Sequence, residues 1–166
     1  MGNHTLAELR DYIWCAADLN IVGAQQVDTI QKPATRARDK YKSGMMYIDG
    51  TFYVDKRDKN NIDYSEPIRK WAEDPKREVG PFNVDTMETT RLDSLTLRLG
   101  YPYLYVHQGN HEHLMSFVDI RLLSSTDPQK VTGKCCKNIV KLYIFCSLFY
   151  FVSQILPLNC YRLSSD

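Results

Sequence analysis

The pattern of hydrophobic and polar positions predicts a helix near the N-terminus. Thr5 and Glu8 stand at capping-box spacing, in which the hydroxyl accepts from a helix amide and the carboxylate reaches back to the cap. The apolar positions that follow recur at helical spacing: Leu6, Leu9, Ile13, Ala16 and Ala17. We therefore expect a first helix that runs to about Leu19.

Two segments have the pattern of β-hairpins. Residues 45–48 and 51–54 are rich in strand formers and flank Asp49-Gly50, a dipeptide typical of a type I′ turn. Further along, residues 103–108 and 112–123 flank Gly109-Asn110. We expect each pair of segments to form two antiparallel strands.

Two more helices are predicted between and beside these hairpins. Ser65-Glu-Pro67 opens a short helix with Ile68 and Trp71 on one side, since proline is tolerated in a first turn. Residues 90–99 carry leucines at i, i+3 and i+7, and Gly100 follows as a C-cap. The fold class expected is α+β: two β-hairpins that form a small mixed sheet packed with about three helices.

The rest of the chain divides into a connection and a tail. Residues 20–43 have no sustained period, so we expect a long basic connection inside a domain that covers residues 1–131. Residues 132–166 form an atypical apolar tail, of which residues 142–161 carry no charge. This stretch is long enough to span a bilayer, but the polar residues within it also fit a buried segment. An ending that is not natural to the domain is the third alternative.

Charge is uneven along a chain that is nearly neutral as a whole. The net charge is +1 over 166 residues, which gives no argument for a nucleic-acid binder from total charge. Basic residues nevertheless gather in two places, and they are the candidate DNA-binding residues: Lys32, Arg36, Arg38, Lys40, Lys42, Lys56 and Arg57. These residues either neutralise phosphates or form an ordinary solvated surface.

Cysteines and catalytic motifs exclude several classes of protein. The five cysteines are an odd number without a CxxC pair, and no secretory signal is present, so we expect reduced thiols inside the cell. The sequence contains no nucleophile elbow, phosphate loop or nucleotide fingerprint. We therefore expect that the chain is not an enzyme.

Histidines concentrate in the second predicted hairpin. If Gly109-Asn110 is a two-residue turn, His111 and His113 share a face with Val106, whereas His107 lies on the other face opposite Glu112. His111 and His113 are then candidate zinc ligands, or they are polar residues at the rim of a hairpin. Two ligands do not complete a zinc site.

The same stretch carries a resemblance to a known family. Four blocks occur in order: TLAELRD near the start, YxxGTFYxDKR at 47–57, LGYPYLYxHQGxxEH at 99–113 and VDIRLL at 118–123. Together they resemble the C-terminal half of the third subunit of the small nuclear RNA-activating protein complex. The resemblance implies a nuclear transcription subunit that works with a Myb-repeat subunit, a smaller scaffold subunit and the general transcription machinery. It also implies binding to the proximal sequence element of small nuclear RNA promoters, for RNA polymerases II and III.

The chain departs from the family pattern in ways that bear on zinc. Relatives carry cysteine where His111 stands and often where Val106 stands, followed by a zinc segment with paired CxxC motifs. Here the similarity to the family stops after about Val131, and the apolar tail replaces that segment. We therefore expect that the family's zinc is lost and that no cofactor is certain. The function expected is promoter recognition, or alternatively a protein-interaction scaffold without direct DNA contact, and membrane attachment is not expected.

Overall fold

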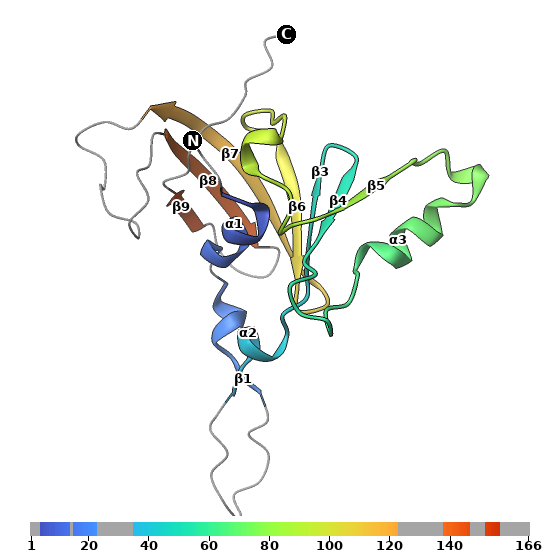
Figure 1. Ribbon diagram of the computed structural model, residues 1–166, viewed down its shortest axis with the longest axis horizontal. Helices are drawn as coiled ribbons and strands as arrows, with labels where there is room; N and C mark the ends of the chain where they lie inside the picture. Colours follow the sequence, from blue (N-terminus) through green and yellow to red (C-terminus); the bar gives the residue numbers. More distant parts are fainter. Residues whose placement is uncertain (1–3, 14, 23–34, 123–137, 147–151, 157–166) are drawn as a thin grey trace, which may run out of the picture.

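The structure is a computed structural model, and it describes residues 4–13, 15–22, 35–122, 138–146 and 152–156. Its main element is a mixed sheet of seven strands in the order β5-β4-β3-β6-β7-β8-β9 (Figure 1). A separate two-stranded sheet pairs β1 (Ile21–Val22) with β2 (Thr35–Arg36). The predicted α+β class is confirmed.

Both predicted hairpins are present in the main sheet. The first joins β3 (Gly44–Ile48) to β4 (Thr51–Val54) through Asp49 and Gly50, which both have the positive φ that a type I′ turn requires. The second joins β6 (Pro102–His107) to β7 (His111–Leu122), and β6 also pairs with β3. β5 (Asn83–Thr86) runs parallel to β4, which makes the sheet mixed as expected.

The first helix is shorter than the sequence pattern predicts. α1 spans Leu6–Tyr12 and begins with the expected capping box between Thr5 and Glu8. The backbone turns to an extended conformation at Ile13, and a 3-10 turn, η1 (Ala16–Leu19), follows. The expected continuation to Leu19 is therefore wrong, since the chain changes direction between the two elements.

The other helices are α2 (Ala37–Lys40) and α3 (Ser65–Ala72), with 3-10 turns η2 (Pro75–Arg77) and η3 (Leu92–Ser94). The helix predicted over residues 90–99 is wrong, because only η3 forms there. The Leu92 amide donates to the His4 carbonyl instead, and Thr5 forms a β-bridge with Arg91. These nonlocal hydrogen bonds replace a helical ladder, and Leu92 and Leu95 are buried while Leu99 is exposed.

The expected connection over residues 20–43 also contains more structure than predicted, since it includes β1, β2 and α2; residues 23–34 of it lie outside the described residues. In the tail, β8 (Asn138–Cys146) and β9 (Val152–Leu156) extend the sheet from β7. Within the described part of the chain, no helix has the length and apolar character needed to cross a membrane.

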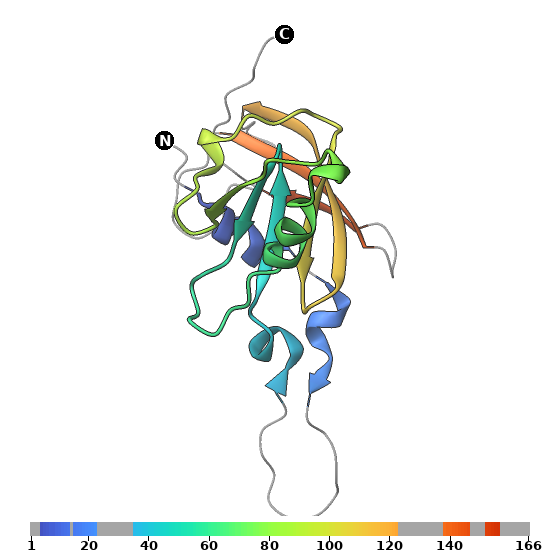
Figure 2. The same ribbon diagram turned by 90° about the vertical axis from the view of Figure 1, so that its right-hand side faces the viewer.

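Apolar side chains pack on both faces of the sheet. The larger cluster lies between the sheet and α1, and its fully buried members include Leu6, Leu9, Met46, Met115 and Phe117. A smaller cluster of Met45, Phe52 and Val106 lies on the opposite face, on the side where α3 projects (Figures 1 and 2). The candidate site described next belongs to the face that α1 covers.

Candidate metal centre

The register of the second hairpin differs from the predicted one by a single residue. His107 pairs with His111, and Tyr105 pairs with His113, so the loop contains the three residues Gln108, Gly109 and Asn110. Gln108 and Gly109 adopt positive φ values of 49° and 88°. The prediction of a two-residue turn is therefore wrong.

This shift exchanges the two faces of β7, because side chains alternate along a strand. His107, His111 and His113 consequently lie on one face together, and the prediction that separated His107 from the other two is wrong. Val106 pairs with Glu112 and packs in the smaller apolar cluster on the opposite face. Valine therefore does not occupy a position within the histidine cluster.

A cysteine from a distant part of the sequence completes a group of four potential metal ligands. Cys15 lies between α1 and η1. Its sulfur lies close to one ring nitrogen of each of His107, His111 and His113. These four ligand atoms all lie within 4.8 Å of one another. Sequence reasoning named His111 and His113 but missed Cys15 and His107.

The histidines are suited to bind a metal as neutral rings. Nε2 of His107 lies 2.8 Å from Nε2 of His113. Burial, followed by the nearby His107 and His111, lowers the pKa of His113 to about 4. Nδ1 of His111 and Nδ1 of His113 are buried without a hydrogen-bond partner among the described residues. Buried nitrogens without partners are costly in a folded protein, and neutral imidazole is a good ligand for zinc.

The donor set fits a closed, tetrahedral zinc site. Zinc takes sulfur at about 2.3 Å and nitrogen at about 2.0–2.1 Å, so neighbouring ligand atoms lie roughly 3.3–3.6 Å apart. The observed spacing, from 2.8 Å to 4.8 Å, brackets this range. One thiolate and three imidazoles would fill all four positions of such an ion and leave none for substrate or water.

The ring of Tyr105 stacks against two of these histidines. Its ring stacks against His107 at 5.2 Å between centroids and against His113 at 5.6 Å. Its hydroxyl accepts a hydrogen bond from Nε of Arg10 at 3.3 Å. Burial raises the pKa of the Tyr105 hydroxyl to about 12, so it stays protonated. The cluster is thereby connected to a charged network around Arg10.

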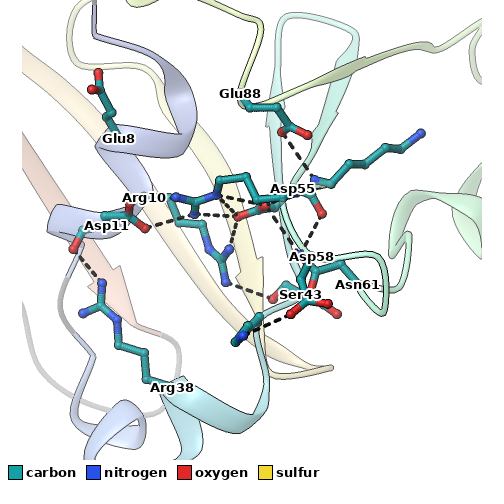
Figure 3. A network of polar contacts seen from close by, with 12 residues as sticks. Glu8, Arg10, Asp11, Arg38, Ser43, Asp55, Asp58, Asn61 and Glu88 are labelled. Carbon is teal, nitrogen blue, oxygen red and sulfur yellow. Dashed lines mark hydrogen bonds and ion pairs between the residues drawn. The ribbon is translucent and has the colours of Figure 1, made fainter.

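That network holds α1 against the loop that follows β4 (Figure 3). Asp55 is fully buried and forms ion pairs with Arg10 and with Arg57, the latter at 2.7 Å. Arg57 also pairs with Asp11 at 2.7 Å. Burial would raise the pKa of the Asp55 carboxyl, but hydrogen bonds from Arg57 and the charge of Arg10 lower it below its ordinary value.

The structure brings part of the predicted DNA-binding set together and leaves part of it apart. Arg38 donates to the Asp11 carbonyl at 2.6 Å, and Lys42 pairs with Asp58 at 3.0 Å. Both residues line a polar cavity of about 300 Å³, together with Arg10, Arg57, Tyr105 and His107. The charges of Lys42 and Arg57 are therefore balanced by carboxylates within the protein, whereas Arg38 donates to a neutral carbonyl.

The other described members of the predicted set, Arg36, Lys40 and Lys56, do not line this cavity. Arg36 and Lys56 are exposed and form no ion pair with any residue that the structure describes. Lys40 lies over the ring of Tyr41 at 5.3 Å. Lys32 lies outside the described residues.

Comparison with known proteins gives a consistent result. Residues 1–133 match the family model described as snRNA-activating protein complex (SNAPc), subunit 3. The chain is similar to snRNA-activating protein complex subunit 3 of Rattus norvegicus and of Bos taurus, each 42% identical over 127 residues, and of Mus musculus, 41% identical over the same length. The alignments cover 76% of this chain and 31% of each relative, so the chain spans about a third of their length.

Proposed function

Since this chain belongs to the family of subunit 3 of the snRNA-activating protein complex, we propose that it acts in the nucleus as a subunit of such a complex. In this role it contributes to recognition of the proximal sequence element of small nuclear RNA genes and supports their transcription by RNA polymerases II and III. The observation that carries the proposal is the family match over residues 1–133, which contain both hairpins and all four residues of the candidate metal centre.

The proposed partners are promoter DNA, a Myb-repeat subunit and a smaller scaffold subunit. Among the predicted DNA-binding residues, Arg36, Lys40 and Lys56 are the best placed for phosphates, since they are exposed and their side chains make no ion pair or hydrogen bond among the described residues. Arg38, Lys42 and Arg57 line a cavity that also contains Asp11, Asp18, Asp55 and Asp58, so we propose a smaller contribution from them. Such contacts supply affinity that is independent of base sequence.

A mobility-shift titration of the reconstituted complex on a proximal-element duplex tests the DNA contact. The variant replaces Arg36, Lys40 and Lys56 with glutamine. The matched control replaces Lys70, Lys76 and Arg77, which lie on α3 and η2, and so removes the same charge. Removal of each phosphate-binding side chain is expected to flatten the salt dependence of log K by about 0.9. Equal slopes for variant and control would contradict a phosphate role.

A second candidate function is an interaction scaffold that does not touch DNA. It is favoured by the nearly neutral net charge and by two ion pairs within the chain, Arg57 with Asp11 and Lys42 with Asp58. If both glutamine variants assemble with the partner subunits and bind the duplex as the unaltered complex does, the scaffold function is supported. Loss of DNA binding in the first variant alone supports the promoter-binding function.

We further propose that Cys15, His107, His111 and His113 hold one zinc ion with a structural role. The support is the co-facial arrangement of the histidines, the inclusion of a thiol and the buried ring nitrogens without partners among the described residues. The ion would tie the segment after α1 to the β6–β7 hairpin. Since four protein ligands leave no open position, we propose no enzymatic activity for this centre.

Metal analysis of the purified chain tests this centre directly. One zinc per chain is expected for the unaltered protein, and substoichiometric zinc is expected for Cys15→Ser and for His113→Asn. The double variant Cys135→Ser, Cys136→Ser is the matched control and is expected to retain the metal. Loss of zinc only in this control would place the ion elsewhere.

A further inference from the structure

A carboxylate lies directly behind one of the candidate ligands. Asp18 belongs to η1, and its Oδ1 lies 3.3 Å from Nδ1 of His107. Both residues are buried, with 6% and 3% of their surfaces exposed. The Asp18 amide also donates to the Cys15 carbonyl at 3.0 Å. One short segment therefore carries a candidate ligand and a carboxylate that contacts a second candidate ligand.

This contact determines which nitrogen of His107 can bind a metal. A carboxylate accepts hydrogen bonds, so Nδ1 of His107 is the ring nitrogen that carries the proton in the neutral imidazole. Nε2 then keeps its lone pair, and Nε2 is the atom that lies 2.8 Å from Nε2 of His113 inside the cluster. The hydrogen bond thus directs the lone pair of His107 toward the other ligands.

Asp18 is itself held in place by the hairpin loop. The side-chain amide of Gln108 donates to Oδ1 of Asp18 at 2.6 Å. The positive φ of Gln108 belongs to the three-residue loop that also sets the register of the histidines. Burial raises the pKa of the Asp18 carboxyl, but hydrogen bonds from His107 and Gln108 outweigh this effect and the net pKa lies below its ordinary value. Asp18 therefore contacts His107 on one side and the loop residue Gln108 on the other.

The other two histidines lack an equivalent support. Nδ1 of His111 and Nδ1 of His113 are buried and accept or donate no hydrogen bond among the described residues. Metal-binding histidines in proteins usually donate their second ring nitrogen to a carboxylate or carbonyl, and removal of this partner typically weakens metal binding about 10–100-fold. His107 is the ring that the protein orients before a metal arrives.

We propose that Asp18 is a positioning residue of the metal centre, which fixes His107 in its metal-binding tautomer and thereby sets the zinc affinity of the site. This inference rests on the proposed zinc site. Gln108 acts one step further out, since its side-chain amide donates to Asp18.

Competition between the purified chain and a chromophoric zinc chelator tests the proposal. Asp18→Ala is expected to lower zinc affinity about 10–100-fold. Asp18→Asn is expected to lower it less, because an amide oxygen still accepts from Nδ1. Asp11→Asn is the matched control, since Asp11 lies nearby on α1 but pairs with Arg57 and contacts none of the four ligands. It is expected to leave affinity unchanged.

Nitrogen-15 NMR of the histidine rings gives a second readout that a merely structural role would not change. In the zinc-loaded chain, His107 is expected in the Nδ1-protonated form, and Asp18→Asn is expected to shift its Nδ1 signal while the fold persists. Unchanged affinity and an unchanged His107 spectrum in both Asp18 variants would overturn the positioning role and leave the zinc site standing. If the unaltered chain binds no zinc, both proposals fail together.

Discussion

His107 and His113 lie with their Nε2 atoms 2.8 Å apart although they are not paired in the register of β6 and β7. The contact is diagonal across the hairpin, and each ring also stacks on Tyr105. Two nitrogen lone pairs repel each other at this distance. Either one ring donates an N–H to the other, or a cation lies between them. A zinc ion held by both rings would be such a cation.

Zinc is expected to stabilise the chain against heat. A ligand present at 100 times its Kd adds about 2.7 kcal/mol to the free energy of unfolding, provided that it binds the folded state alone. Differential scanning calorimetry with and without a strong chelator measures the change in Tm. In the Cys15→Ser variant the chelator is expected to have a much smaller effect, and an equal effect there would exclude Cys15 as a ligand.

The register of the second hairpin can be tested with one substitution on each face. His107→Ala is expected to weaken zinc binding, because His107 lies within the cluster. Glu112→Ala is expected to leave zinc binding intact, because Glu112 pairs with Val106 on the opposite face. Isothermal titration with zinc compares the two variants. Equal affinities for the two variants would favour a two-residue turn, in which His107 and Glu112 both lie on the face away from His111 and His113.

Asp55 is expected to dominate the electrostatic stability of the domain. Removal of one partner from a buried ion pair typically costs about 3–5 kcal/mol, so Asp55→Asn should destabilise the fold by that order in urea unfolding at pH 7. Asp58→Asn is the matched control, since Asp58 pairs with Lys42 near the surface, and it is expected to have little effect.

The effect of Asp55 is also expected to depend on pH. The folded pKa of Asp55 is lowered from its ordinary value of 3.8. Its contribution to stability is therefore complete above the unfolded pKa and disappears as the pH falls through the folded pKa. Urea titrations at descending pH should show the difference between the unaltered chain and Asp55→Asn narrow below about pH 4. A constant difference down to about pH 2 would contradict the ion pair.

Two substitutions of Tyr105 distinguish the role of its ring from that of its hydroxyl. Tyr105→Phe removes the acceptor of the Arg10 hydrogen bond but keeps the stacked ring, so a destabilisation of about 1 kcal/mol and an unchanged zinc affinity are expected. Tyr105→Ala removes the base under His107 and His113, and a destabilisation of about 3–5 kcal/mol is expected by analogy with other large aromatic truncations in cores. Chemical unfolding and zinc titration of both variants provide the comparison.

Local signals in the sequence predicted local structure well. The capping box at Thr5 and Glu8 and the Asp49-Gly50 turn are both confirmed, since each depends on hydrogen bonds or dihedral angles of neighbouring residues. The helix expected over residues 90–99 failed for the opposite reason. The Leu92 amide donates to the His4 carbonyl of the N-terminal segment, and Leu92 and Leu95 are buried while Leu99 is exposed. The spacing of the three leucines does not distinguish this arrangement from a helix.

The candidate site was only half predictable. His111 and His113 follow from composition, but the position of His107 depends on whether the loop has two or three residues, and the sequence allows both. Gln108 has a positive φ, which glycine or asparagine adopts more readily. Either residue at this position would have indicated the three-residue loop more clearly. Cys15 carried no local signal, because only the tertiary fold brings it to the hairpin.

The ligand order along the chain has a consequence for how the unfolded protein would meet a metal. Three of the four donors lie on one hairpin, so that hairpin can capture an ion locally, whereas Cys15 must arrive across most of the family-matched segment. A covalent cross-link that closes a loop of roughly 100 residues restricts the unfolded chain by about 4.7 kcal/mol in the simplest entropy model. A zinc–thiolate bond would impose a comparable restriction reversibly, in addition to the buried leucines and ion pairs that hold α1.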